Sequence, residues 1–260
     1  MNATAPAERE RIPAWLWLWA GPAIIVAQVA LKASSEERYR RWMRGELGLV
    51  ENLTVAFLVG ALVCAVACYR ERRRVRWRFF GPALIVVAAG LFFFAGEEAS
   101  WGQHWLGFAP PEGIAARNDQ GEFNLHNDPL FEKFLDQLPR LVLTLGALVG
   151  GVIAPLVRRG RRPRDFASAS PWGWAWPTAV CFPAALLAIL VTLPEKVFKA
   201  LDRPVTAALD ISPGETKEYC LALFLFVYLL SLLLALRAPE SYPLRAGAPA
   251  PGERIADRVP

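Results

Sequence analysis

Six long apolar runs constrain this chain more than any other feature of its sequence. They lie at about 14–32, 49–69, 79–101, 138–157, 172–194 and 217–236. A helix needs about 17 to 25 predominantly apolar residues to cross the hydrocarbon core of a bilayer. The chain is 54% hydrophobic with a mean hydropathy of +0.28, which is too apolar for a typical soluble domain. The sequence therefore predicts an all-α integral membrane bundle of about six transmembrane helices.

Some of these runs carry features that a simple span lacks. Pro155 lies at the end of the fourth run, and Pro177 and Pro183 lie within the fifth, so we expect kinks there. In the fourth run Gly146 and Gly150 form a GxxxG pair, which is either a close helix contact or a chance feature of a glycine-rich segment. The first run is either an uncleaved span or a cleaved signal peptide, and the length of its apolar region favours the span.

The chain is predicted to form one integral membrane domain at residues 13–237. The two ends, 1–12 and 238–260, bury almost nothing and are expected to be disordered. The stretch SSEERYRRWMRGEL at residues 34–47 predicts a short helix on the membrane surface with a serine N-cap. An aromatic belt at the headgroup level is predicted from the tryptophans at span ends. These are Trp15, Trp17, Trp77, Trp101, Trp105, Trp172 and Trp174.

Basic residues are distributed unevenly between alternate loops. The N-terminal end, the loops 70–78 and 158–171 and the tail from Arg237 together hold 17 Lys and Arg residues, whereas the segments 32–48, 102–137 and 195–217 hold 11. Because such residues concentrate on the cytoplasmic side, both termini are predicted to be cytoplasmic and the protein to lie in the inner, or plasma, membrane. The net charge of +5 then indicates topology and contact with anionic membrane lipids, and no nucleic-acid partner is expected.

All four cysteines, Cys64, Cys68, Cys181 and Cys220, fall inside predicted spans. They therefore give no indication of a disulfide framework outside the membrane. Cys64 and Cys68 are one helical turn apart, and small packing residues explain such a pair better than a metal or redox site does.

Acidic residues at span ends all fall on one face of the predicted membrane. Helix alternation from cytoplasmic termini puts the start of the second span, the end of the third and the start of the sixth on the outer face. A carboxylate at the bilayer centre costs several kcal/mol, whereas one near the headgroups costs little. The acids at these outer ends are Glu51, Glu97, Glu98, Glu215 and Glu218.

Further polar side chains follow the paired glutamates in the stretch EEASWGQH. Serine, glutamine and histidine are costly at a buried helix end unless they form hydrogen bonds. On an unbroken helix Glu97 and His104 would share a face, whereas Gly102 could end the helix first. The candidate catalytic residues here are Glu97, Glu98 and Ser100, and Gln103 is a candidate substrate-binding residue.

The segment 102–137 is the longest loop and the one densest in polar side chains. Phe and Leu are interleaved with its polar residues, which predicts a cap that packs back onto the helix bundle, with a simply solvated loop as the alternative. Its imidazole makes His126 a further candidate catalytic residue. The candidate substrate-binding residues in the loop are Asn118, Gln120, Glu122, Asn124 and Asn127.

Two strings in this region carry a resemblance to a known family. Glu97-Glu98-x-Ser100-Trp101-Gly102-Gln103 and Asn118-x-Gln120-Gly121-Glu122-x-Asn124-Leu125-His126-Asn127 resemble the signature of an uncharacterised group of bacterial multi-pass membrane proteins. The resemblance covers about residues 94–128. It implies a Glu near the start of the second span and another that opens the last, which Glu51 and Glu218 match. It favours His126 over His104 as a site residue, and it implies no activity.

A more distant similarity is to the ceramidase and progestin-receptor superfamily of membrane hydrolases, which place a carboxylate, a serine and histidines around zinc. The chain departs from that pattern because it has only two histidines, and neither lies in its last helices. The similarity therefore concerns the type of site alone.

Three functions are compatible with these residues. The first is an enzyme acting on a lipid or lipid-linked substrate at the outer membrane face with a divalent metal such as Zn. Carboxylate and imidazole donors suit Zn, Mn or Fe, and a bound cation would relieve the clustered negative charge. One glutamate would act as general base for a metal-bound water, and Asn124 or Gln103 would orient the substrate. The candidate metal ligands are Glu98, His126, Glu51 and Glu218.

The second function is that of a noncatalytic assembly or interaction protein, in which a satisfied polar network locks the outer loop onto the helices. The third is an ion-coupled transporter, because acidic residues within membranes often carry protons. The acids gather at one face and no inverted repeat is detected, which disfavours transport. The sequence does not predict the oligomeric state.

Overall fold

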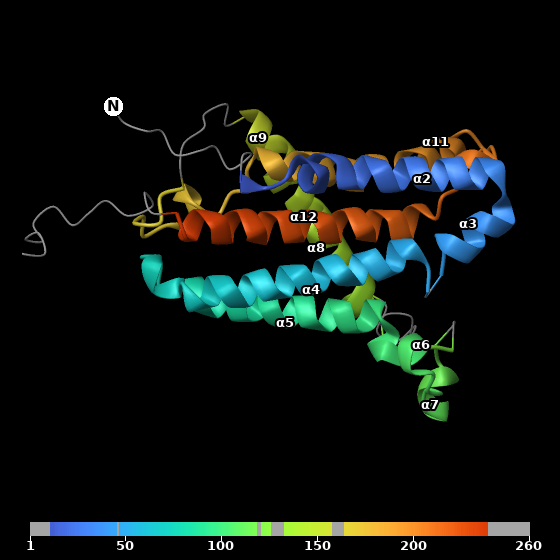
Figure 1. Cartoon of the computed structure of the whole chain (residues 1–260), viewed down its shortest axis with the longest axis horizontal. Helices are drawn as coiled ribbons and strands as arrows, with labels where there is room; N and C mark the ends of the chain where they lie inside the picture. The colour runs from blue at the N-terminus through green and yellow to red at the C-terminus, as the bar shows by residue number, and fades with distance from the viewer. Residues whose placement is uncertain (1–10, 46, 119–120, 126–132, 158–163, 239–260) are drawn as a thin grey trace, which may run out of the picture.

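The computed structural model describes residues 11–45, 47–118, 121–125, 133–157 and 164–238 (Figure 1). Within these ranges the chain is helical and contains no strand. Six helical stretches are long and apolar enough to cross a membrane, which confirms the predicted all-α, six-span architecture. They are Trp15–Ser34, Leu49–Arg70, Phe80–Glu98, Lys133–Val157, Ala179–Ala200 and Ala207–Leu236.

Several spans are built from more than one helical piece. The first joins η1 (Trp15–Trp19) to α2 (Ala20–Ser34), and the second and third are α4 (Leu49–Arg70) and α5 (Phe80–Glu98). The fourth comprises η4 (Lys133–Gln137), α8 (Leu138–Gly146), η5 (Ala147–Ile153) and α9 (Ala154–Val157). The fifth comprises η7 (Ala179–Cys181), α10 (Phe182–Leu190) and α11 (Leu193–Ala200), and the sixth η8 (Ala207–Leu209) and α12 (Pro213–Leu236). Short elements between spans are α3 (Glu36–Trp42), η2 (Arg72–Arg74), η3 (Ser100–Gly102), α6 (Gln103–Leu106), α7 (Glu112–Ala115) and η6 (Pro171–Gly173).

Helix α12 forms the centre of the bundle. In Figure 1 it runs between α2 on one side and α4 with α5 on the other. Two thirds of its apolar window (67%) is buried, against at most 39% in the other five spans. One buried cluster joins α12 to α2 and α10, and a second joins it to α4 and α5. The fold therefore depends on one helix that both halves share.

The two ends of the bundle differ in their side chains. Arg11 donates a hydrogen bond to the carbonyl of Leu234 (3.3 Å) and Arg74 to that of Leu236 (3.0 Å), so the beginning of η1 and the end of α12 lie together. We call this the arginine end, after residues 70–78. The opposite end, where α4 and α12 begin and α5 ends, we call the capped end, and its cap is formed by the described residues 103–118 and 121–125. Which end faces the cytoplasm stays a prediction.

Prolines act at helix boundaries more than as kinks. The fifth span begins at Ala179, so the prediction of 172 was wrong, and Pro177 precedes the helix while Pro183 lies in the first turn of α10. A first-turn proline leaves no intrahelical bond broken, because its missing N–H has no partner there anyway. The described part of the fourth span already includes Lys133, which lies before the predicted start at 138, and its π-helical η5 ends at Ile153, two residues before Pro155. A proline cannot donate to the carbonyl four residues earlier, and this favours the wider turn.

Small residues set the closest helix contacts. A Cβ at Gly151 would lie 2.4 Å from Cβ of Ala185, and one at Gly150 would lie 3.1 Å from the Pro177 ring. A Cβ at Gly146 would meet nothing within 4 Å, so only half of the GxxxG pair is at a contact. The four cysteines are buried and none forms a disulfide, and burial of Cys64 and Cys68 is as expected of packing residues.

One tryptophan of the predicted belt lies in the core instead. Trp174 is 4% exposed and packs edge-on against Phe80 (ring centroids 4.9 Å apart) and stacked on Phe166 (6.2 Å). Its segment, residues 172–178, is apolar but not helical apart from the turn η6, so it packs against α5 as an irregular loop. Trp15 and Trp172 are exposed, as a belt requires.

The predicted surface helix is α3. Ser35 caps it by accepting a hydrogen bond from the backbone N–H of Arg38 (3.3 Å). Tyr39 is fully buried and donates its hydroxyl hydrogen to Ser212 Oγ (3.3 Å), just before α12 begins. This contact fixes α3 at the capped end.

Candidate functional site

The candidate site begins where α5 ends. The helix stops at Glu98, not at residue 101 as predicted, because the chain turns left-handed: φ is +42° at Ser100, +52° at Trp101 and +86° at Gly102. Glycine adopts this conformation freely, whereas each of the other two residues costs about 1–3 kcal/mol. Such strain persists only where surrounding contacts hold it in place.

Trp101 supplies several of those contacts. Its ring folds back on α5 and lies edge-on to Phe92 and Phe93, with centroids 5.8 and 6.3 Å away. The ring also covers Gly96, where a Cβ would come within 2.8 Å of it. The indole Nε1 donates to Glu97 Oε1 at 2.7 Å. Trp101 was predicted to be a membrane anchor, and the structure makes it part of the polar site.

Glu97 ties the cap to the end of α5. Glu97 is only 3% exposed. While Oε1 accepts from Trp101, Oε2 accepts the backbone N–H of Leu125 at 2.7 Å. Both oxygens of this carboxylate therefore accept hydrogen bonds from the protein itself. One donor, Trp101, lies just before the cap, and the other, Leu125, is the last residue of the cap.

Ser100, Glu122 and Asn124 form the buried centre of the network. Asn124 Nδ2 donates to Glu122 Oε2 (2.7 Å) and to Ser100 Oγ (3.1 Å). The Ser100 hydroxyl in turn donates to Glu122 Oε2 (3.3 Å). All three residues are at most 7% exposed, so each polar group faces another polar group of the protein. Such satisfied networks rigidify the segments they join.

Amide side chains fold the cap onto itself. Asn118 Nδ2 donates to Oδ1 of Asn124 (2.6 Å) and to its backbone oxygen (3.0 Å), and Asn118 Oδ1 accepts from the backbone N–H of Glu122 (3.2 Å). Gln103 Oε1 accepts the N–H of Phe123 at 2.6 Å. These amides, predicted to contact a substrate, therefore satisfy the backbone of the cap.

His104 approaches the same carboxylate from α6. Its Nε2 lies 3.8 Å from Glu122 Oε1, which is an ion pair only when the imidazole is protonated. Since α5 ends at Glu98, Glu97 and His104 do not share one helix, and the break comes before Gly102, at Ser100 and Trp101.

Glu51 lies beside this network in the first turn of α4. Its Oε2 is buried and has no hydrogen-bond partner among the described residues. The neighbouring Asn52 accepts a hydrogen bond from the Trp105 indole (3.2 Å), which joins α6 to α4. Two acids predicted at another span end lie near it, since Glu215 and Glu218, together with Glu122 of the cap, are the charged groups that act on the Glu51 carboxylate.

Two arginines that sequence reasoning missed pair with the acids of α12. Arg44 lies 3.9 Å from Glu215, and Arg140, at the start of α8, forms an ion pair with Glu218. The sequence did contain a signal for such a pair, because Arg140 is a single basic residue at the same depth as the acids. These pairs leave Glu215 and Glu218 partly compensated.

The structure brings together Glu97, Ser100, Gln103, Asn118, Glu122 and Asn124, with Glu51 and Glu218 beside them. Glu98 is half-buried in the last turn of α5. The predicted Gln120, His126 and Asn127 lie outside the described residues. Among the described residues, no group of three His, Cys, Asp or Glu side chains could hold a metal ion, so the metal prediction depends on His126.

Comparison of the chain with protein-family models, with curated proteins and with solved structures gave no match. The signature resemblance in residues 94–128 accordingly stays a prediction.

Proposed function

We propose that the protein binds the headgroup of a lipid or lipid-linked molecule at the capped end of the bundle. The observation that carries this proposal is the Glu51 carboxylate, whose buried Oε2 has no hydrogen-bond partner among the described residues. A buried acceptor without a donor costs about 1–3 kcal/mol, and a ligand donor would recover that energy. The position at a helix end within a six-span bundle favours a ligand that resides in the membrane.

The charges around Glu51 favour a cationic donor. Glu215, Glu122 and Glu218 act on the Glu51 carboxylate, and these acidic neighbours make the local electrostatic potential negative. An ammonium group supplies both a positive charge and N–H donors. Phosphatidylethanolamine carries such a group, whereas phosphatidylcholine has a similar charge without an N–H. The proposal therefore predicts discrimination between these two headgroups.

Native mass spectrometry of the detergent-purified protein with each lipid tests this. We expect the parent to bind phosphatidylethanolamine with at least a tenfold lower Kd than phosphatidylcholine, which corresponds to about 1.4 kcal/mol. Glu51→Gln should abolish the difference. Glu37→Gln, an exposed glutamate on α3 at the same end, is the matched control and should keep it. Equal affinity of the parent for both lipids, or unchanged selectivity in Glu51→Gln, would contradict the proposal.

The second candidate is a noncatalytic interaction protein, and a separate observation favours it. The oxygens of Glu97 are both occupied by the protein, and the Glu122 carboxylate contacts Ser100, Asn124 and His104, so these acids hold the cap rigid. If Glu51→Gln binds lipid as the parent does while Glu97 variants lose the cap, this candidate replaces the first.

The same preparations test the prediction of a metal-dependent enzyme. Elemental mass spectrometry would support it if the parent holds a near-stoichiometric transition metal that both Glu98→Gln and His126→Ala lose while keeping the parent's size-exclusion profile. A metal-free parent would remove that prediction and leave lipid binding to be judged by the lipid experiment alone.

A further inference from the structure

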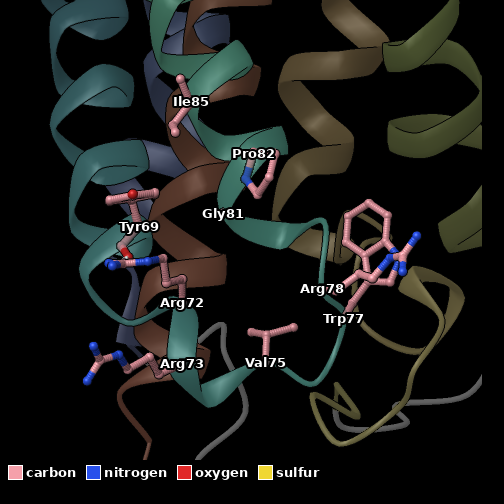
Figure 2. A pocket seen from close by; sticks show the side chains of 9 residues that line it. All are labelled: Tyr69, Arg72, Arg73, Val75, Trp77, Arg78, Gly81, Pro82 and Ile85. Carbon is pink, nitrogen blue, oxygen red and sulfur yellow. Dashed lines mark hydrogen bonds between the residues drawn. The ribbon is translucent and has the colours of Figure 1, made fainter.

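The arginine end contains an open surface pocket of about 360 Å³, which we call the cavity, where α4 ends and α5 begins (Figure 2). Its lining includes three arginines, Arg72, Arg73 and Arg78, and the rings of Tyr69 and Trp77. In Figure 2, Arg72 and Arg73 lie on the side of Tyr69, and Arg78 lies with Trp77 across the connecting loop. Three guanidinium groups thus come from one short connection, residues 72–78.

Among the described residues these three arginines, like Arg70 and Arg76, have no acidic partner, whereas Arg74 has one. Glu71 pairs with Arg74 (2.8 Å) and with Arg237 (3.4 Å). Within the described ranges, no carboxylate lies within ion-pair distance of the three cavity arginines. Each guanidinium has five N–H donors and stays charged at any physiological pH. The cavity therefore presents positive charge that the described protein does not neutralise.

Arg72 is held in place against the cavity wall. Its guanidinium lies over the Tyr69 ring, 4.2 Å from the centroid, and its Nη1 donates to the Tyr69 carbonyl at 3.0 Å. Gly81 in the first turn of α5 leaves room for this side chain, because a Cβ there would lie 3.2 Å from Cδ of Arg72. One donor is used by the carbonyl, and the remaining donors of the fork are available to a ligand.

The start of α5 adds to the positive potential. The N-cap residue, Phe79, has no side-chain acceptor for the first N–H groups of this 19-residue helix, and Gly81 and Pro82 of its first turn line the cavity. The N-terminus of a helix carries a partial positive charge that favours anions.

The remaining wall of the cavity is apolar and faces outward. Pro82 and Ile85 line it, both are exposed, and Ile85 is 55% exposed on a helix long and apolar enough to span a membrane. A free phosphate ion has no apolar part that could pack against such a wall. A lipid would place its acyl chain along this outer face of α5 and its headgroup among the arginines.

We propose that this cavity binds the phosphate-bearing headgroup of an anionic membrane lipid, with Arg72 and Arg73 on one side and Arg78 on the other supplying the positive potential, and with the acyl chain packing on Pro82 and Ile85. Basic pockets at the ends of membrane helices bind such headgroups in general, and each arginine near a membrane surface adds to the attraction. This inference concerns the opposite end from Glu51 and does not rest on the proposed function.

Native mass spectrometry with phosphatidylglycerol and phosphatidylcholine measures the binding. The parent should bind phosphatidylglycerol with at least a tenfold lower Kd than phosphatidylcholine. The triple variant Arg72→Gln, Arg73→Gln, Arg78→Gln should lose this preference. The control triple variant Arg38→Gln, Arg41→Gln, Arg203→Gln removes the same charge from exposed residues outside the cavity and should retain it. No preference in the parent, or equal loss in both triple variants, overturns the proposal.

A second variant keeps the charge and so guards against misfolding of the first. Replacing the same three arginines by lysine preserves the net charge but removes the planar forks that bind phosphate through two hydrogen bonds. We expect a loss of several-fold in affinity for phosphatidylglycerol. If the lysine variant binds as tightly as the parent, general charge attraction explains the binding and the cavity is not a built site.

Competition with inorganic phosphate separates the two sources of a phosphate group. For a lipid site, excess inorganic phosphate should displace little of the bound phosphatidylglycerol, since it cannot use the apolar wall. Complete displacement, with phosphate itself bound by the parent and not by the glutamine variant, would make a soluble phosphate the ligand and overturn the lipid assignment.

Discussion

The two ends of this bundle use polar side chains in opposite ways. At the capped end, Glu97, Ser100, Asn118, Glu122 and Asn124 are buried and bond to one another and to the backbone of the cap. At the arginine end, the three cavity arginines surround an open volume and have no described acidic partner. Polar groups that face inward organise the chain, whereas polar groups that face a cavity indicate a ligand. Glu51 lies at the capped end but differs from that network, because its buried Oε2 has no hydrogen-bond partner among the described residues.

Removing Glu97 should give the largest effect on stability. Glu97→Ala leaves the Trp101 indole and the Leu125 N–H without their acceptor at a partly buried position, at about 1–3 kcal/mol for each donor. We expect a loss of about 3 kcal/mol in the free energy of unfolding, measured by reversible denaturation in mixed micelles. Arg73→Ala at the other end should change it by less than about 0.5 kcal/mol.

This pair of variants can break the comparison directly. Equal destabilisation by Glu97→Ala and Arg73→Ala would mean that the arginine end is also a structural network. Limited proteolysis adds a local measurement, because cleavage within residues 103–125 should accelerate in Glu97→Ala and remain at the parent rate in Arg73→Ala.

Crowding the Trp101 ring should give an intermediate effect. A Cβ at Gly96 would lie 2.8 Å from that ring, so Gly96→Ala forces the indole away from Glu97 and should cost about 1–3 kcal/mol. Gly90→Ala is the control in the same helix, since a Cβ there meets nothing within 4 Å. Thermal unfolding followed by tryptophan fluorescence would compare the two. Similar melting temperatures for both variants would show that Trp101 does not hold the left-handed turn.

The smallest effect should come from an exposed ion pair at the capped end. Hydrogen bonds from Lys32 and Arg40 hold the pKa of Glu36 below its ordinary value. A carboxyl whose pKa is lowered on folding adds stability above its unfolded pKa, and this contribution disappears as the pH falls through the folded value. Glu36→Gln should therefore melt slightly below the parent at pH 7, and the two should melt together once the pH is low enough to protonate Glu36 in the folded protein. A difference that grows as the pH falls would contradict this sign.

The number of spans could be predicted from the sequence because hydropathy and length decide it. The first and last residues of the spans could not be predicted where proline and a change of chain direction compete with hydropathy. The stretch PWGWAWP at residues 171–177 is as apolar as a helix, yet it packs as an irregular segment around Trp174. Apolar character indicates burial or contact with lipid, and it does not by itself specify a helix.

The members of the polar network could also be predicted, but not their partners. Glu97, Ser100, Asn118, Glu122 and Asn124 were all candidates, since polar side chains at a membrane face need a reason. Their pairing follows from the left-handed turn at residues 100–102, which reverses the chain and brings the cap over α5. No local pattern signals two left-handed residues that are not glycine, because tertiary contacts are what stabilise them.

The central place of α12 has a consequence for biogenesis. This helix emerges from the ribosome after the other five spans, yet both buried clusters require it. Membrane helices insert individually and associate afterwards. The first five spans must therefore remain in the bilayer without the element that joins them. Until the last span inserts, Arg140 lacks its contact with Glu218, and Tyr39 lacks its contact with Ser212. During that interval, before the last helix completes the bundle, the protein is most susceptible to degradation by quality-control proteases.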